Sequence, residues 1–212
     1  MKNGILHEVE STFLHQMKVI LEDSYELRVF FENELNSIYW AEKAILKMLS
    51  KLGENSISDK LFVSLEDHLP VKKEQLSRVE EIFNAIALTP EEIKCDAVAR
   101  LFNEMDRIIA TTEVGYLRDS WAISVLQKIA FYEITSYGTL RSFADLSGQT
   151  EVADLLNQTL DEEKAYTLEL SKIGDVILKD ITSEVKVKKT ARPARIAKYS
   201  DSQLFQPFYR LA

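Results

Sequence analysis

Apolar residues recur every three or four positions along most of the chain, which is the spacing of one face of an α-helix. Helix starts and stops divide this pattern into four long segments and one short segment. The long helices are expected over residues 24–52, 58–87, 120–147 and 150–179, and the short one from Thr89 to about Ala110. No run alternates apolar and polar residues in the period of a strand. The pattern therefore predicts an all-α protein, an antiparallel four-helix bundle with a short crossover helix.

The boundaries of these helices rest on capping residues. Side chains that favour a helix start lie at Ser24, at Ser56 or Ser58, at Thr89 with Pro90, at Asp119 or Ser120, and at Thr150. Glycines that favour a helix end or a turn follow three of the segments, at Gly53, Gly115 and Gly148. Each predicted helix thus has a local signal for at least one of its ends.

Two extensions flank the predicted bundle, giving an organisation of residues 1–23, 24–179 and 180–212. The first extension is expected to form an amphipathic helix over 3–22, whose apolar side consists of Ile5, Val9, Phe13, Met17, Ile20 and Leu21. The last extension carries seven basic and three acidic residues, a net charge of +4, and ends in Phe205, Phe208 and Tyr209. We expect these extensions to pack on the bundle or on a second subunit, so that the protein is a homodimer.

Composition argues against a nucleic-acid-binding, disulfide-bonded or membrane-spanning protein. The net charge of −8 over 212 residues argues against nucleic-acid binding by the whole chain, because phosphate would be repelled. The single cysteine, Cys95, excludes a disulfide within the chain and fits a reducing compartment. No apolar run is long enough to span a membrane, and the first residues lack the apolar run of a signal peptide. A cytoplasmic protein without a membrane partner is the expectation.

Four ionisable residues interrupt the apolar stripes near the middle of the long helices: Glu42, His68, Glu133 and Glu163. In an antiparallel bundle they would converge at one depth, and this ligand set suits iron, manganese or zinc. Because no Glu-x-x-His pair is present, at most a single ion is expected rather than a dinuclear centre. The alternative is that no ion binds. Lys72, one turn after His68, would then supply the positive charge of a buried Lys–Glu network held by tyrosine hydroxyls.

Several stretches resemble the YciF/YciE-type ferritin-like family. They are Asn36–Lys43, His68–Leu69 with Gln75 and Arg78–Phe83, Cys95, Tyr132–Arg141, Gly148–Ala153 and Leu160–Lys164. The resemblance covers roughly residues 27 to 176. It implies a ferritin-like four-helix bundle with a short helix in the crossover, usually dimeric, associated with bacterial stress responses and of poorly defined activity. It also implies a dinuclear metal site.

The chain departs from this family where the metal would lie. The family typically has acidic or histidine residues where this chain has Ser37, Val71, Ala130 and Phe131, and commonly has Thr at the position of Lys72. The positions that still match are Glu42, His68, Glu133 and the pair Glu162–Glu163. The resemblance therefore supports the fold more strongly than the metal chemistry.

The predicted function is that of a stress-associated, non-enzymatic, ferritin-like protein with a degenerate metal site and no cofactor. The alternative is a metal-binding protein with a reduced iron or manganese site at Glu42, His68, Glu133 and Glu163, similar to a ferroxidase or a storage protein. A third possibility, a nucleic-acid or acidic partner bound by the basic tail, is disfavoured by the acidic body. No catalytic triad and no glycine-rich phosphate loop are visible, so we assign no catalytic residue and no small-molecule substrate.

Overall fold

The structure, a computed structural model, describes residues 25–191. All regular structure in this range is helical, as predicted. The helices are α2 (Tyr25–Gly53), α3 (Asp59–Ala85), α4 (Asp96–Thr111), α5 (Tyr116–Leu146) and α6 (Thr150–Ala191). The helix expected over 3–22, the Ser24 cap and the aromatic end of the tail lie outside the described residues. None of the described helices is long and apolar enough to cross a membrane.

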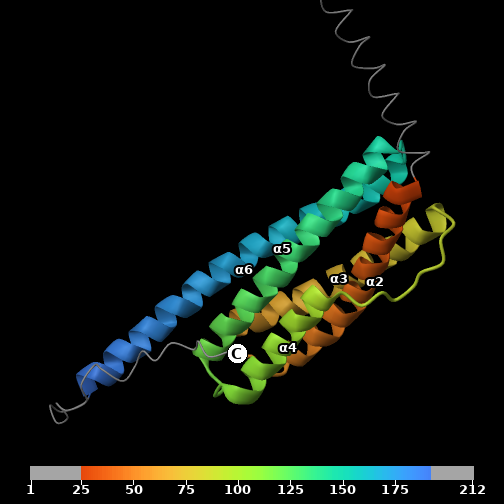
Figure 1. The fold of residues 1–212 in the computed structure, drawn as a ribbon. Helices are drawn as coiled ribbons and strands as arrows, with labels where there is room; N and C mark the ends of the chain where they lie inside the picture. The colour runs from red at the N-terminus through yellow and green to blue at the C-terminus, as the bar shows by residue number, and fades with distance from the viewer. Residues whose placement is uncertain (1–24, 192–212) are drawn as a thin grey trace, which may run out of the picture.

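The four long helices form a bundle, shown in Figure 1. α5 packs along α6, α2 packs against α3, and further contacts join α3 to α6 and α2 to α5. The α2–α3 and α5–α6 connections are short, so each of these pairs is antiparallel. The long connection from α3 to α5 contains α4, which packs on α5. The predicted all-α bundle with a crossover helix is confirmed.

Most of the apolar residues that helical spacing predicts to face the core are buried. They form two separate clusters. One cluster contains Leu52, Leu61 and Leu126, and the other contains Leu35, Phe83 and Leu156. In every long helix the chain passes from one cluster to the other near mid-length. The ionisable residues of the stripes lie at these crossings. A buried polar layer therefore separates the two apolar halves of the core.

The predicted start of the short helix at Thr89 and Pro90 is wrong, because α4 begins at Asp96 after Cys95. The segment before it lies against α2 instead. The backbone N–H of Glu91 donates to Oδ1 of Asn36 at 2.6 Å, and Lys43 of α2 pairs with Glu92. These contacts hold the segment in a non-helical conformation, although Thr89 and Pro90 are typical of a helix start.

The predicted cap of α5 at Asp119 or Ser120 is also wrong, since α5 begins at Tyr116 after Gly115. Asp119 is buried inside the helix, and its Oδ2 accepts hydrogen bonds from the backbone N–H groups of Ile57 and Ser58 at 3.1 and 2.8 Å. Asp119 thus supports the start of α3. The predicted cap at Ser58 is confirmed, because its hydroxyl accepts from the N–H of Leu61.

The turn between α5 and α6 lies where it is predicted, whereas α6 is longer than predicted. Gly148 has a φ of 72°, the left-handed conformation that favours glycine, and α6 starts two residues later at Thr150. At its other end α6 continues past residue 179 to Ala191. The predicted boundary between bundle and tail therefore falls within a continuous helix.

Candidate functional site

The structure brings together all four residues that the sequence singled out. Glu42 comes from α2, His68 from α3, Glu133 from α5 and Glu163 from α6, and none is more than 5% exposed. Each interrupts an apolar stripe at the boundary between the two clusters. Because one element supplies each residue, the layer ties all four long helices together.

Lys72 lies in the middle of these groups. It follows His68 by one helical turn on α3 and is 1% exposed. Its Nζ lies 3.0 Å from Oε1 of Glu163 and 3.2 Å from Oε2 of Glu42, and it donates to Oε1 of Glu133. A single ammonium group therefore contacts the carboxyl groups of three other helices, which is the arrangement of the buried Lys–Glu network.

Two tyrosines complete the layer. The hydroxyl of Tyr137, fully buried on α5, donates to Oε1 of Glu42 at 2.6 Å. The ring of Tyr166 on α6 stacks on the ring of His68, with centroids 3.5 Å apart and planes within 6° of each other. The first contact fixes one carboxyl group and the second fixes the plane of the imidazole.

Sequence reasoning missed a second set of polar residues beside this layer. Arg78 of α3 donates from one nitrogen to both carboxylate oxygens of Glu162 at 2.7 and 2.8 Å, and from the other to the hydroxyl of Thr159 at 2.7 Å. Gln75 donates to the same carboxylate at 3.1 Å. The available signals were the resemblance, which includes Gln75 and Arg78, and their three-residue spacing, which puts these two side chains on one side of α3.

Burial and the mutual contacts shift the pKa values of the charged groups. Burial alone would lower the pKa of Lys72, but Glu133, Glu163 and Glu42 outweigh it and raise that pKa well above its usual value. Burial, reinforced by the Glu163 carboxylate, raises the pKa of Glu133 well above its usual value. Burial acts in the same direction on Glu163, yet Lys72 and His68 overcome it and lower the pKa of that carboxyl group. The Lys72 ammonium therefore favours the ionised form of Glu163, whereas burial favours the protonated form of Glu133.

The imidazole of His68 is neutral at physiological pH. Burial lowers its pKa to about 4, and the nearby Lys72 ammonium acts in the same direction, against the opposing effect of Glu163. Its Nε2 lies 3.6 Å from Oε1 of Glu163, which is beyond an ordinary hydrogen bond. A neutral imidazole is the form that could bind a metal, and stacking on Tyr166 holds it in place.

A metal ion does not fit this layer while Lys72 is charged. Glu42, Glu133 and Glu163 would be its oxygen ligands, but all three already contact the ammonium. An ion bound to them would lie next to a buried positive charge, and the two would repel each other. Within residues 25–183, no group of three or more His, Cys, Asp or Glu side chains is arranged to hold a metal. The expected single ion therefore stays an untested prediction.

Comparison with known proteins places the chain in a family. The model of a domain of unknown function, DUF892, matches residues 26–182. The chain belongs to the DUF892 family. Among curated proteins, YciF of Escherichia coli is 34% identical over 145 residues, covering 68% of this chain and 87% of YciF. The resemblance read from the sequence is confirmed, and its boundaries agree closely with the matched range.

Three solved structures share the fold. The crystal structure of the E. coli stress protein YciF superposes with a TM-score of 0.70 at 31% identity, covering 74% of this chain and 99% of that one. YcfI of Rhodopseudomonas palustris, whose description proposes a structural role, gives a TM-score of 0.64 at 29% identity, covering 67% and 90%. A Xanthomonas campestris protein at 16% identity shares the fold alone, with a TM-score of 0.60 and coverage of 75% and 98%.

Proposed function

We propose that this DUF892 member is a stress-associated, non-enzymatic bundle, in which the Lys72 ammonium takes the central position of a degenerate metal site. The observation that carries this proposal is the contact of one buried ammonium with three carboxyl groups from three other helices. Buried carboxyl groups need a compensating partner, and here the chain itself supplies that partner. The structural role proposed for the R. palustris relative agrees with this view.

A positive charge fixed by a side chain differs in one respect from a bound metal. It has no open coordination position, so it offers no place for oxygen, water or a substrate to bind. The contacts of Lys72 hold α2, α3, α5 and α6 together. The proposed role is therefore structural: the protein keeps a stable helical bundle under stress.

A second candidate is a reduced iron or manganese site in the same layer. It is favoured by atoms that have no hydrogen-bond partner within the described residues, Nε2 of His68 and Oε2 of Glu163. Buried atoms of this kind are normally paired, and a metal ion would satisfy them. For such an ion to bind, Lys72 would have to lose its proton or leave the layer.

Aerobic oxidation of Fe(II) separates the two candidates. We expect the purified full-length chain to oxidise Fe(II) no faster than its His68→Ala variant or buffer alone. Faster oxidation by the wild-type chain, abolished by His68→Ala, would support the metal site and contradict the non-enzymatic scaffold. The His68→Ala variant is the matched control because it removes the candidate nitrogen ligand and leaves Lys72 with its three carboxyl partners.

We further propose that the protein is a cytoplasmic homodimer. A single cysteine fits a reducing compartment. Large apolar side chains are exposed along α5 and α6, among them Trp121, Phe131 and Leu168, and a second subunit would cover them. Sedimentation of the full-length chain tests this, with a dimer expected and a shift toward monomer on removal of residues 199–212. A full-length chain that sediments as a monomer at all concentrations would contradict the proposal.

A further inference from the structure

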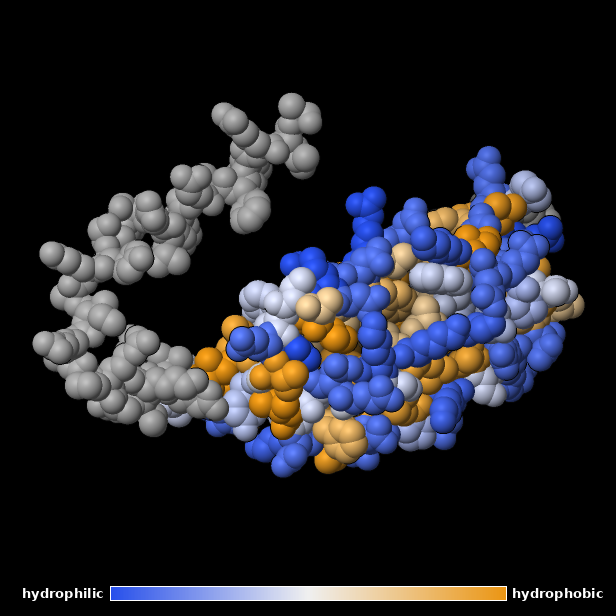
Figure 2. Space-filling model, turned by 90° about the horizontal axis from the view of Figure 1, so that it is seen from below, coloured by the Kyte–Doolittle hydropathy of each residue, from blue (hydrophilic) through white to orange (hydrophobic). Residues whose placement is uncertain are grey.

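A groove of about 410 Å³ lies between α2 and the crossover helix α4. Its apolar lining consists of Trp40, Ala44 and Met48 of α2 and Phe102 of α4. The Trp40 and Phe102 rings are neighbours, with centroids 6.1 Å apart. Sites for small molecules have volumes of about 300–1,000 Å³, so the groove is large enough for one. Figure 2 shows the bundle from below, with hydrophobic side chains exposed between rows of hydrophilic ones.

The shape of the groove follows from one small residue in a row of long ones. Trp40, Ala44, Lys47 and Lys51 are spaced by four, three and four residues, which puts them on one side of α2. Ala44 has no side-chain atom beyond Cβ, and it is only half-buried. It therefore leaves space between the Trp40 ring and the Lys47 side chain, where a flat group fits.

Three lysines follow the groove along α2, and acidic residues pair with the outer two. Lys43 forms an ion pair with Glu92. Nζ of Lys51 lies 2.7 Å from Oδ1 of Asp106. Lys47, four residues from each of the other lysines, forms no ion pair or hydrogen bond with any residue that the structure describes. Because like charges four residues apart on a helix repel each other, an anion beside Lys47 would be favourable.

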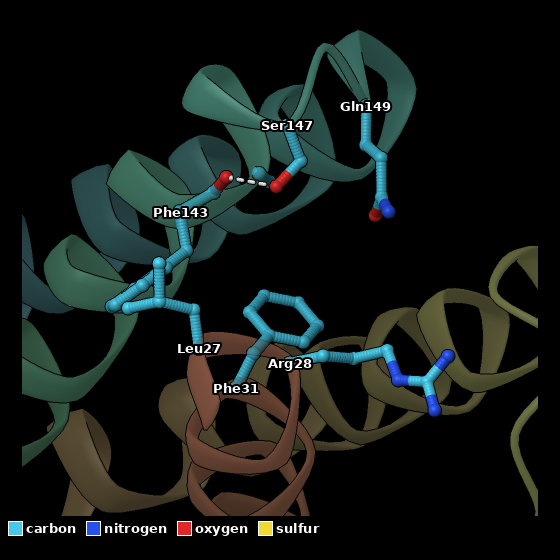
Figure 3. A pocket seen from close by; sticks show the side chains of 7 residues that line it. Leu27, Arg28, Phe31, Phe143, Ser147 and Gln149 are labelled. Atoms are coloured by element: carbon cyan, nitrogen blue, oxygen red, sulfur yellow. Dashed lines mark hydrogen bonds between the residues drawn. The ribbon is translucent and has the colours of Figure 1, made fainter. Parts of the chain in front are cut away.

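The cavity at the start of α2 does not offer this combination. Arg28 is the charged residue of its lining, and Nε of Arg28 lies 3.4 Å from Oε1 of Glu32. Figure 3 shows the Arg28 guanidinium pointing away from the Phe143 side chain. An anion with an apolar body would therefore find an unpaired cation and an aromatic surface side by side only in the groove between α2 and α4, of these two sites.

We propose that this groove binds a small aromatic monocarboxylate, with its ring against Trp40 and Phe102 and its carboxylate beside Lys47. Aromatic rings attract one another in offset and tilted arrangements. Glu92 and Asp106, at the two ends of the groove, would repel a second negative charge, so the ligand carries one. Among the described residues, none from the buried polar layer lines the groove. The site is therefore independent of the proposed structural role.

Titration of the full-length chain with 1-naphthoate, followed by the indole N–H signals in nitrogen–proton NMR spectra, tests this proposal. The chain has two tryptophans, and Trp121→Phe assigns their signals. Trp40 lines the groove, whereas Trp121 is 45% exposed and lines a different hollow beside the turn between α4 and α5. Trp121 is therefore an internal control for ligand that stacks on any exposed indole. We expect a saturable shift of the Trp40 signal and little change in the Trp121 signal.

The charge of Lys47 is tested with a ligand pair and a variant pair. The neutral 1-naphthamide should need about threefold or more the concentration of 1-naphthoate for half-saturation, because it cannot pair with the ammonium. Lys47→Ala should weaken 1-naphthoate binding by a similar factor and leave 1-naphthamide binding unchanged. Lys73→Ala, at an exposed position of α3 outside the groove, is the control and should change neither.

The space above Ala44 is tested by filling it. Ala44→Leu should weaken 1-naphthoate binding at least about tenfold, since the added side chain occupies the place of the ring. Ala44→Ser stays small and should bind as the wild type does. Circular dichroism checks that each variant keeps its helices.

Three results would overturn the proposal. The first is no saturable shift of the Trp40 signal, as expected if a second copy covers the groove. The second is a shift of equal size and affinity at Trp40 and Trp121. The third is equal affinity of the wild type for 1-naphthoate and 1-naphthamide. None of the three needs a variant of the groove, so the test stays decisive even if a substitution there unfolds the chain.

Discussion

The Nζ atom of Lys72 lies 3.0 Å from Oε1 of Glu163, and both side chains are completely buried. The same carboxylate oxygen lies 3.6 Å from Nε2 of His68, one turn earlier on α3. The Glu163 carboxylate thus faces a permanent cation and a neutral imidazole. The polar layer contains its own positive charge before any ion binds.

Replacing Lys72 by Met should lower the free energy of unfolding by roughly 3–5 kcal/mol, because breaking a buried ion pair leaves uncompensated charge in the core. Urea unfolding at pH 7 measures this loss. The control is Lys164→Met, which removes an exposed lysine 3.0 Å from Asp161 and should leave the midpoint nearly unchanged. A loss below about 1 kcal/mol for Lys72→Met would contradict the central role of the ammonium.

His68 should make the protein less stable in acid. Its pKa is about 4 in the folded protein against 6.5 for the ordinary side chain. Between pH 4 and 6.5 the His68 side chain binds a proton in the unfolded chain but not in the folded chain. The contribution of His68 to the free energy of unfolding is therefore complete above pH 6.5 and is lost as the pH falls toward 4. The loss reaches roughly 3 kcal/mol at about 1.4 kcal/mol per pH unit.

Unfolding free energies measured from pH 4 to 7 test this dependence. The slope should be smaller in His68→Phe, which keeps a ring to stack on Tyr166 but has no proton to gain. Identical slopes for the wild type and His68→Phe would show that the imidazole is not held neutral by burial.

Arg78→Lys should destabilise the bundle by roughly 1–3 kcal/mol, although it keeps the positive charge. A lysine cannot contact both oxygens of Glu162 and the hydroxyl of Thr159 at once, as the guanidinium does. Thermal unfolding measures the effect. Arg141→Lys is the control, because Arg141 makes a more exposed contact with Asp145 one turn away. Equal shifts in the two variants would mean that the geometry of Arg78 is unimportant.

Asp119→Ala should cost roughly 2–3 kcal/mol, since it leaves buried N–H groups at the start of α3 without their acceptor. The donors are the hydroxyl of Ser56 and the backbone of Ile57 and Ser58. Asp154→Ala, at an exposed position of α6, is the control for loss of a carboxylate in general. If both variants unfold at the same urea concentration, Asp119 does not stabilise α3.

Hydrophobic periodicity was sufficient to predict the fold and the centre of the site. In α6, every residue that helical spacing predicts to face the core is buried: Val152, Leu156, Thr159, Glu163, Tyr166, Leu170, Ile173 and Ile177. Glu42, His68, Glu133 and Glu163 could be recognised because a charge in an apolar stripe is costly and needs a partner. Lys72 could be placed with them because it follows His68 by one turn.

The errors occur where contacts between distant segments decide the structure. The helical spacing of apolar and ionisable residues over 58–87 predicts a buried side that consists of Leu61, Leu65, His68, Lys72, Leu76, Val79, Phe83 and Ile86. In the structure Leu76 is only half-buried, whereas Gln75, which is not in this set, is fully buried. Gln75 faces inward because its partner is Glu162, and no local pattern shows a contact between residues 87 positions apart. Likewise, Asp119 has a local capping signal but supports a different helix. Capping signals are local, whereas tertiary hydrogen bonds determine which segment uses them.

The metal content of the purified chain tests the central claim most directly. Cells would be grown with iron, manganese and zinc, the protein purified without chelators, and metal per chain measured by elemental analysis for the wild type, His68→Ala and Lys72→Thr. We predict almost no metal in the wild type and in His68→Ala, and uptake by Lys72→Thr, which frees the carboxyl groups. A stoichiometric amount of metal in the wild type, lost in His68→Ala, would contradict the claim that the Lys72 ammonium replaces the ion.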